Sequence, residues 1–305
     1  MFSCTSMKPV FKLRFPDKMS DHWDALSGNV NAISLLEKHP DQICWPRLAG
    51  NPNAIHLLDS QLASCPSSIN AFLLSMNPNV LPLLEKYPEK RDMYGLSVNP
   101  NALPWIEQHL DKLEHWELLS KNPNAIHLLE KYPKKIDWGY LSANPNAIHL
   151  LKKRLDKVHW KQLSGNPNAI PLLEKHLDKV DWEQLSGNPS AIPLLEKNLD
   201  RIDWAMLSRN PNAIPLLEKY PERIDWYGLS LNPNTSLLEK NIDRVDWSAV
   251  GWNPNAIHLV QTLDYEQIKE NNQDFRSELL ERVFDPDRMI RLAKGMPLRN
   301  YLSLY

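Results

Sequence analysis

The sequence lacks the features of several common functional classes. The three cysteines, Cys4, Cys44 and Cys65, form no Cys-x-x-Cys pair, which indicates reduced thiols rather than a disulfide framework or a zinc site. The 35 basic and 37 acidic residues leave a net charge of -2, so no overall field attracts nucleic acid or an anionic membrane. No apolar run approaches the roughly 18 residues that cross a bilayer, and residues 1–18 lack the apolar core of a secretory signal. We therefore expect a soluble, intracellular protein that binds neither nucleic acid nor membrane.

Glycine is also scarce. There are 9 glycines, against 25 prolines and 11 tryptophans, so proline and tryptophan must have a systematic use. Tryptophans recur every 22 residues along much of the chain, at Trp116, Trp138, Trp160, Trp182, Trp204 and Trp226. An Asn-Pro-Asn triplet or a variant of it begins six residues after each tryptophan position, and its first asparagines are Asn29, Asn51, Asn77, Asn99, Asn122, Asn144, Asn166, Asn188, Asn210, Asn232 and Asn253. Two markers that agree over these eleven units predict stacked supersecondary elements.

Each unit has the pattern of one helix followed by a shorter one. In a representative unit, Ile170, Leu173 and Leu177 fall on one apolar helical stripe. Pro171 must lie in the first turn of that helix, where its missing N–H is not needed. Asp181 is then the predicted cap of a short α- or 3-10 helix that begins at the following tryptophan.

A single 22-residue unit cannot bury enough apolar surface to fold alone, so the Ile, Leu and Trp columns of successive units must form one continuous core. The sequence predicts an all-α fold: an α-solenoid of about eleven units wound into a superhelix, extended as a rod or arc on the order of 100 Å long. We assign the repeats to residues 23–261, an N-terminal cap to residues 1–22 and a helical C-terminal cap to residues 262–305. The asparagine column is expected to bond to turn backbones between layers.

The repeat is least regular over residues 59–116. The spacing from Asn51 to Asn77 is four residues longer than usual, and Ala71 and Met93 occupy tryptophan positions. Insertions in solenoids map to loops on one face, which are often binding loops. Repeat decay that the packing tolerates explains the same pattern and is the interpretation we favour.

The string NPNAIHLLEKYPKKIDWGYLSANPNAIHLL, at residues 122–151, resembles tandem repeats in uncharacterised proteins of giant DNA viruses, the mimivirus-like group. This resemblance covers nearly the whole chain, and the tail FDPDRMIRLAKG is similar to the Phe-x-Pro-x-Arg ending of such proteins. More distantly, NPNTSLLEK resembles the leucine-rich-repeat variant, which pairs an α-helix with a 3-10 helix in a right-handed superhelix. A member of that family holds an iron–sulfur cluster through a cysteine cluster absent here, so no cofactor is implied. The resemblances imply a right-handed solenoid and a viral setting, in host cytoplasm or virion, but no activity.

The polar residues recur once per layer, whereas a catalytic site needs a unique constellation. The Glu-Lys pairs of successive units are typical of a solvated face. Four histidines share the position that proline takes elsewhere, and with no third ligand beside them they are expected to be exposed first-turn residues rather than a metal site; they are His56, His127, His149 and His258. We predict no catalytic, cofactor-binding or metal-binding residue.

The tryptophan column has two interpretations. Exposed aromatic ladders bind sugars, proline-rich peptides or single-stranded bases, but the leucine three residues after each tryptophan indicates a core-facing first turn, which we favour. Trp252 breaks the period and is expected to be exposed. The variable positions after each tryptophan are better suited to recognition, because no core contact fixes them. The candidate partner-binding residues are Tyr140, Lys161, Gln162, Glu183, Met206, Tyr227 and Trp252.

Together these features favour a non-catalytic scaffold that binds a host or viral protein. A structural virion or assembly component is the main alternative. An enzyme with a site in the irregular stretch, near Cys65 or His109, is a remote alternative.

Overall fold

The computed structural model describes residues 11–14, 16–113, 116–263 and 270, and most of them lie in short helices and the turns between them. The predicted all-α solenoid is confirmed. A unit begins with an α-helix at the tryptophan position and continues through an Asn-Pro-Asn turn, a second α-helix and a 3-10 helix. An extended segment then leads to the next unit. The sequence pattern did not distinguish the 3-10 helix from the α-helix that precedes it.

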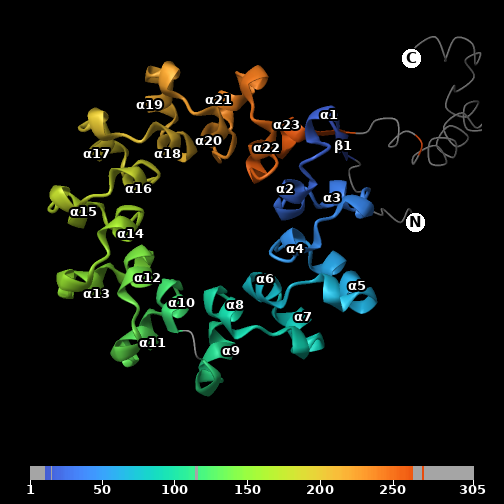
Figure 1. Ribbon diagram of the computed structural model, residues 1–305, viewed down its shortest axis with the longest axis horizontal. Helices are drawn as coiled ribbons and strands as arrows, with labels where there is room; N and C mark the ends of the chain where they lie inside the picture. Colours follow the sequence, from blue (N-terminus) through green and yellow to red (C-terminus); the bar gives the residue numbers. More distant parts are fainter. Residues whose placement is uncertain (1–10, 15, 114–115, 264–269, 271–305) are drawn as a thin grey trace, which may run out of the picture. The chain divides into compact units, whose positions relative to one another are not determined.

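The helices that begin at the tryptophan positions line the inside of the curved array in Figure 1, and we call them the inner helices. They are α2 (Trp23–Gly28), α4 (Trp45–Leu48), α6 (Ala71–Met76), α8 (Met93–Val98), α10 (Trp116–Lys121), α12 (Trp138–Ala143), α14 (Trp160–Ser164), α16 (Trp182–Ser186), α18 (Trp204–Arg209), α20 (Trp226–Ser230) and α22 (Trp247–Val250).

The helices that follow the Asn-Pro-Asn turns are the outer helices. They are α3 (Ile33–Leu36), α5 (Ile55–Ser64), α7 (Leu81–Lys86), α9 (Leu103–Glu107), α11 (Ile126–Lys131), α13 (Ile148–Lys153), α15 (Ile170–Leu173), α17 (Ile192–Glu196), α19 (Ile214–Lys219), α21 (Ser236–Glu239) and α23 (Ile257–Val260). The 3-10 helices after them are η1 (Pro40–Gln42), η2 (Pro66–Ser68), η3 (Pro88–Lys90), η4 (Leu110–Lys112), η5 (Pro133–Lys135), η7 (Leu155–Lys157), η8 (Leu177–Lys179), η9 (Leu199–Arg201), η10 (Pro221–Arg223) and η11 (Ile242–Arg244).

A few elements lie outside this pattern. Two Asn-Pro-Asn turns are themselves 3-10 helices, η6 (Pro145–Ala147) and η12 (Pro254–Ala256). Before the first unit comes α1 (Pro16–Met19), and the short strands β1 (Phe11–Leu13) and β2 (Gln261–Leu263) pair with each other. Residues 13–261 form one compact unit, while residues 1–12 and 262–305 form another that is described only at 11–12, 262–263 and 270.

The repeat array closes on itself. In Figure 1 the helices of residues 16–260 follow one another around a ring, and α22 of the last unit contacts α1. Asn29 of the first unit donates from Nδ2 to the carbonyl oxygens of Gly251, at 2.9 Å, and Asn253, at 3.2 Å. Across the same seam, the Asn31 side chain donates to the carbonyl oxygen of Pro254 at 2.9 Å. These bonds are the same in kind as those that join the other layers.

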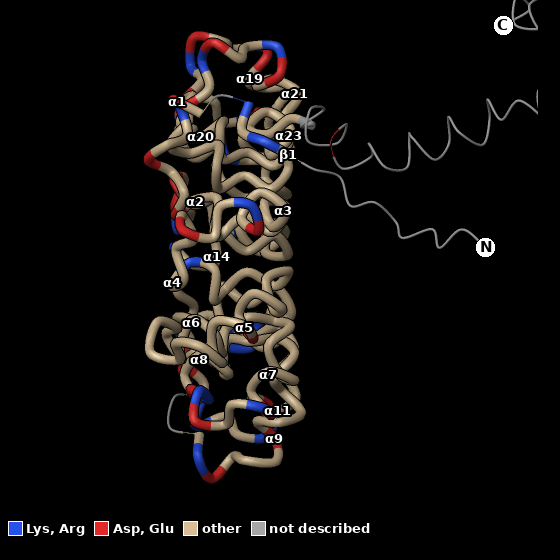
Figure 2. Tube along the Cα trace, turned by 90° about the vertical axis from the view of Figure 1, so that its right-hand side faces the viewer, with Lys and Arg blue, Asp and Glu red and all other residues tan. Residues whose placement is uncertain are grey.

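The closed ring differs from the rod or arc that uniform stacking suggested. Each layer is turned relative to its neighbour, and the turns of eleven layers bring the last back to the first. Seen from the edge in Figure 2, the ring is a flat band along which acidic and basic residues are interspersed. Met19 of α1 is fully buried, and its Cε lies 3.3 Å from where a Cβ on Gly251 would stand, so α1 packs on the last layer. Most of the two predicted caps, 1–22 and 262–305, lies outside the described residues.

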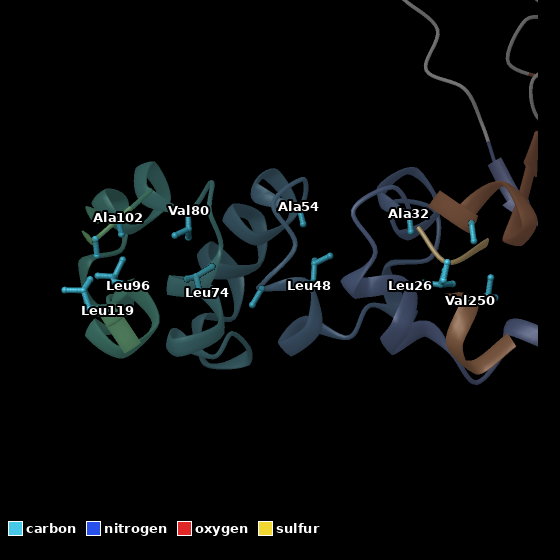
Figure 3. Packing of buried hydrophobic residues seen from close by; sticks show 14 of the residues in the cluster. Leu26, Ala32, Leu48, Ala54, Leu74, Val80, Leu96, Ala102, Leu119 and Val250 are labelled. Atoms are coloured by element: carbon cyan, nitrogen blue, oxygen red, sulfur yellow. The ribbon is translucent and has the colours of Figure 1, made fainter. Parts of the chain in front are cut away.

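The core is built from columns of apolar side chains, two of them at the inner helices and the turns and others on the outer helices, where Leu151 and Leu173 are fully buried. Of the first two, one contains the leucine, or in the last layer valine, three residues after each tryptophan position, and the other contains the residue three after each first asparagine, mostly alanine. Figure 3 shows members of both columns from five layers and Val250 beside them at the seam: Leu26, Ala32, Leu48, Ala54, Leu74, Val80, Leu96, Ala102 and Leu119. Alanine in one column leaves room for the larger leucines of the other, which gives the dense packing that a core requires.

One detail of the predicted apolar stripe is wrong. Leu173 is fully buried and Ile170 half-buried, but Leu177 is 41% exposed. The reason is that α15 ends at Leu173, so Leu177 begins the separate helix η8 and no longer follows the helical period. Pro171 lies in the first turn of α15, as the sequence predicted.

The asparagine column joins every layer to the one before it. In each unit the first asparagine of the triplet is buried, and its Nδ2 donates to two backbone carbonyls of the preceding layer, while its Oδ1 accepts the N–H two residues on. In Asn166 these bonds run to the carbonyl oxygens of Ser142, at 3.1 Å, and Asn144, at 2.9 Å. The predicted inter-layer ladder is therefore confirmed, and it runs without interruption through the seam at Asn29.

A second buried polar column was not predicted. Nine units carry a serine four residues after the tryptophan position, and all nine are fully buried: Ser27, Ser75, Ser97, Ser120, Ser142, Ser164, Ser186, Ser208 and Ser230. Ser164 is representative, because its Oγ donates to the Trp160 carbonyl at 2.9 Å and accepts the backbone N–H of Asp181 at 3.0 Å. The hydroxyl therefore uses both its donor and its acceptor, and it fixes the start of the next inner helix.

Candidate binding surface on the inner helices

The inner helices present a surface that the core does not use. The tryptophan and the leucine three residues later pack on the hydrophobic core. Of the two residues between them, at least one is exposed in nine of the eleven layers, while the second is buried in others, as at Ala25, Leu118 and Ala249. We call the exposed residues at these two positions the inner rim. They are Asp24, Pro46, Arg47, Tyr94, Tyr140, Lys161, Gln162, Glu183, Ala205, Tyr227 and Ser248.

The inner rim holds one of two sets of exposed large apolar side chains in the described chain. Tyr94, Tyr140 and Tyr227 are 37%, 40% and 45% exposed, and all three stand directly after a tryptophan position or one residue later. The second set is aliphatic and begins the 3-10 helices; it contains Leu155, Leu177, Leu199 and Ile242. The regular core therefore leaves aromatic side chains on one row of the ring and aliphatic side chains on another.

The candidate residues predicted from the sequence fall into three groups. Tyr140, Gln162 and Tyr227 are exposed. Lys161 and Glu183 are exposed as well but contact each other across the layer boundary, with Lys161 Nζ 3.8 Å from Glu183 Oε2 and 3.9 Å from Asp181 Oδ2.

The other two candidates are less accessible. Met206 is half-buried, because its Cε packs 3.1 Å from the Cβ position of Gly187 in the preceding layer. Trp252 is half-buried, not exposed as expected. Its ring covers Gly28 so closely that a Cβ there would stand 2.8 Å from ring atom Cζ3, and the Arg47 guanidinium lies over the ring at 5.0 Å. Trp252 departs from the 22-residue period because it packs across the seam where the ring closes.

A hollow of about 330 Å³ opens on the inner helices between α10, α12 and α14. Gly139 leaves space at the position directly after Trp138, since a Cβ there would approach only Asp137 Oδ1, at 3.2 Å. The polar side chains around the hollow are Lys121, Asp137, Tyr140, His159 and Gln162. The structure thus brings two predicted residues, Tyr140 and Gln162, to one site.

Three residues of this hollow were missed by sequence reasoning. Gly139 could have been found as the glycine that directly follows a tryptophan, a position with a side chain in the other units that keep the tryptophan. His159 stands where most other units carry the capping aspartate, but this substitution alone does not place it near Tyr140. Lys121 gave no signal, because only the stacking of three layers brings the last residue of α10 and the start of α14 to the same hollow.

The tryptophan column itself is a poor candidate for a ligand-binding site. The tryptophans pack on the core and are half-buried apart from the buried Trp116. In several layers a cation from the 3-10 helix of the same unit lies over the ring: Arg201 stands 5.2 Å above Trp182, and Arg244 stands 5.2 Å above Trp226. The outer side of these rings is thus covered by the chain's own cation–π contacts.

The histidine column is exposed, and each member pairs with a glutamate of the preceding outer helix. The distances from Nε2 to the glutamate Oε1 are 2.9 Å for His56 to Glu37 and 3.0 Å for His149 to Glu130. His127 with Glu107 and His258 with Glu239 form the same contact. Among the described residues no group of three or more His, Cys, Asp or Glu side chains is placed to hold a metal ion.

The irregular stretch contains a second hollow, of about 270 Å³, between α7 and α9. Trp105 lines it, with Arg91 at 5.7 Å over the ring and Glu85 nearby. The two residues proposed for an enzymatic site do not line it. His109 instead stacks on Trp105 with ring centroids 4.0 Å apart and bonds through Nδ1 to the Trp105 carbonyl.

Comparisons with known proteins add no assignment, since no family model, curated protein or solved structure matches this chain. Within residues 16–113 and 116–263, no helix is long and apolar enough to span a membrane.

Proposed function

We propose that the chain is a non-catalytic ring scaffold whose inner rim binds a protein segment. The observation that carries this proposal is the placement of the exposed tyrosines. Tyr94, Tyr140 and Tyr227 lie on inner helices with about two-fifths of their surface exposed, where neither the core nor the asparagine ladder needs an aromatic side chain. Tyrosine gives large, rigid contact area at low entropic cost and is enriched at the centres of protein interfaces.

The closed ring limits the size of such a partner. Eleven layers at about 9 Å each give a circumference of roughly 100 Å and a diameter of roughly 30 Å, from which the inner helices take about 10 Å. An opening on the order of 20 Å accepts a loop, a chain terminus or a single helix rather than a broad domain surface. The partner is therefore proposed to present a narrow segment.

A viral origin is part of the proposal and rests on the resemblance of the repeats to those of giant DNA viruses. It assigns the protein to host cytoplasm or virion and makes the partner a host or viral protein. Proximity labelling with the full chain in infected host cells tests both points. We expect a set of labelled proteins that is lost when Tyr140 and Tyr227 are both changed to alanine.

The matched control replaces Leu155 and Leu177, which are 39% and 41% exposed on the 3-10 helices, by alanine. This variant removes similar exposed apolar surface from another row and should keep the labelled set. Loss of the set in the leucine variant, with retention in the tyrosine variant, would contradict binding at the inner rim.

That leucine result would favour the alternative function, a structural virion or assembly component. The observation behind the alternative is the aliphatic row itself, because exposed leucine has no evident structural role at the start of a 3-10 helix. Such a component would be abundant in purified particles, whereas absence from particles would exclude it.

A further inference from the structure

We infer that the hollow between α10, α12 and α14 binds a carboxylate side chain of the partner segment. This inference rests on the proposed function and specifies the chemistry of one contact within it. The hollow is distinct from the repeated surface, since no other layer combines a glycine directly after the tryptophan with a histidine at the next capping position.

Hydrogen-bond donors dominate the hollow. The Lys121 ammonium, the Tyr140 hydroxyl and the Gln162 amide have no partner among the described residues, and all three residues are exposed. The backbone N–H of Gln162 donates to His159 Nδ1 at 3.4 Å, and this leaves Nε2 as the N–H donor of a neutral ring. Four donors therefore border a hollow of about 330 Å³.

The hollow contains one acidic side chain, and the backbone holds one of its oxygens. Asp137 is its one carboxylate, and Asp137 Oδ1 accepts the backbone N–H of Tyr140 at 2.9 Å as the cap of α12. In the next layers the capping position carries Asp181 and Asp203, but here it carries His159, so one negative charge of the repeat is missing. An anionic ligand would meet a lysine and three neutral donors beside the single carboxylate of Asp137, and donors of this kind bind carboxylates.

The adjacent layer shows the same chemistry within the chain. Where Gly139 leaves space, the next unit has Lys161, and its ammonium reaches the carboxylates of Asp181 and Glu183 at 3.9 and 3.8 Å. The lysine of that layer is thus satisfied by acidic side chains of the layer after it. Lys121 has no such partner, and the hollow beside it is the place where an external carboxylate would take the role of Glu183.

The test selects peptides from a random displayed library on the full chain and then measures their affinity. We expect enriched peptides to share an aspartate or glutamate, and replacement of that residue by its amide to weaken binding on the order of tenfold or more. Lys121→Ala and His159→Asp should weaken binding to a similar degree. The second variant restores the capping aspartate of the repeat, so it should fold at least as well as the natural chain. Lys131→Ala, which removes an exposed lysine of the outer helix α11, is the matched control and should change nothing.

Each other outcome has a defined meaning. Peptides that bind, lose affinity in Tyr140→Ala and Tyr227→Ala, but ignore the amide replacement and both hollow variants would overturn this inference and leave the proposed function intact. Selection of no peptide that depends on the tyrosines would contradict the proposed function, and the inference with it. Free glutarate is the third arm: if it binds as tightly as the acidic peptides, the hollow takes a small-molecule anion and the assignment to a protein side chain is wrong.

Discussion

The stretch from α5 to α9 and the stretch from α10 to α20 are built on the same ladder with different inner surfaces. In the first, α5 has ten residues, and Ala71 and Met93 stand where the second has tryptophan. Even so, Asn77 Nδ2 still donates to the carbonyl oxygens of Ala49 and Asn51, at 3.0 and 2.8 Å. The insertion lengthens an outer helix without disturbing the spacing of layers. The asparagine ladder, which is present in both stretches, therefore sets the stacking of the layers more than the tryptophan column does.

The largest expected effect follows from this comparison. Asn77→Ala in the irregular stretch and Asn166→Ala in the regular stretch should each lower the free energy of unfolding by on the order of 3 kcal/mol, because each removes three hydrogen bonds. The carbonyls of Asn51 and Asn144 keep their bonds from turn N–H groups, but those of Ala49 and Ser142 lose the asparagine donor. Urea unfolding of both variants measures this. Asn198→Ala is the control, since Asn198 bonds within its own layer to the Leu194 carbonyl at 2.8 Å and is only part-buried. If Asn77→Ala lowered the free energy of unfolding no more than Asn198→Ala, the asparagine ladder would not be what stabilises the irregular stretch.

The second prediction contrasts two glycines. A Cβ on Gly95 would stand 2.5 Å from the Phe72 carbonyl oxygen, so α6 and α8 approach each other more closely than alanine allows. Gly95→Ala should therefore cost about 1–3 kcal/mol through overpacking. A Cβ on Gly139 would meet only the Asp137 side chain, at 3.2 Å, so Gly139→Ala should be close to neutral, since alanine is the better helix former. The difference in thermal midpoint between the two variants checks this, and equal midpoints would contradict the close approach of α6 and α8.

Local periodicity was enough to predict most of the fold. The period of 22, the proline in the first turn of α15 and the asparagine ladder all follow from short-range rules, and all are present in the structure. Closure of the ring could not be predicted, because it depends on the small turn of each layer summed over eleven layers. Trp252 shows the consequence: it looked like an exposed irregularity, but its contacts with Gly28 and Arg47 make it part of the seam.

The candidate site was predicted only in part, because it too depends on how the layers stack. The rule that variable positions follow each tryptophan located Tyr140, Gln162 and Tyr227 correctly on the surface. It did not separate Met206, which reaches back to the preceding layer, from its exposed neighbours. Nor could it identify the hollow, because Lys121 and His159 line it together only through the stacking of three layers.

The smallest expected effect lies in the insertion. The Lys86 ammonium, 2.6 Å from Asp59 Oδ1, holds the pKa of that carboxyl below its usual value, with Tyr87 donating a further hydrogen bond. A lowered folded pKa gives stability above the unfolded value of about 3.9 that is lost as the pH falls through the folded pKa. The stability difference between the natural chain and Asp59→Asn should thus be present near neutral pH and vanish in acid. A difference that stays constant across this range would show that the pair contributes nothing through its charge.

The central claim is that the first and last layers are neighbours, and a distance across the seam tests it most directly. Spin labels at Asp24 and Ser248, both exposed directly after a tryptophan of adjoining layers, can be compared with labels at Glu183 and Ala205 in the regular stretch, after the native cysteines are replaced. Because adjacent layers lie about 9 Å apart, the separation is measured as dipolar broadening of the continuous-wave electron paramagnetic resonance spectrum, and both pairs should be broadened alike. A seam pair without broadening, beside a broadened reference pair, would show that the array is an open arc and would contradict the closed ring.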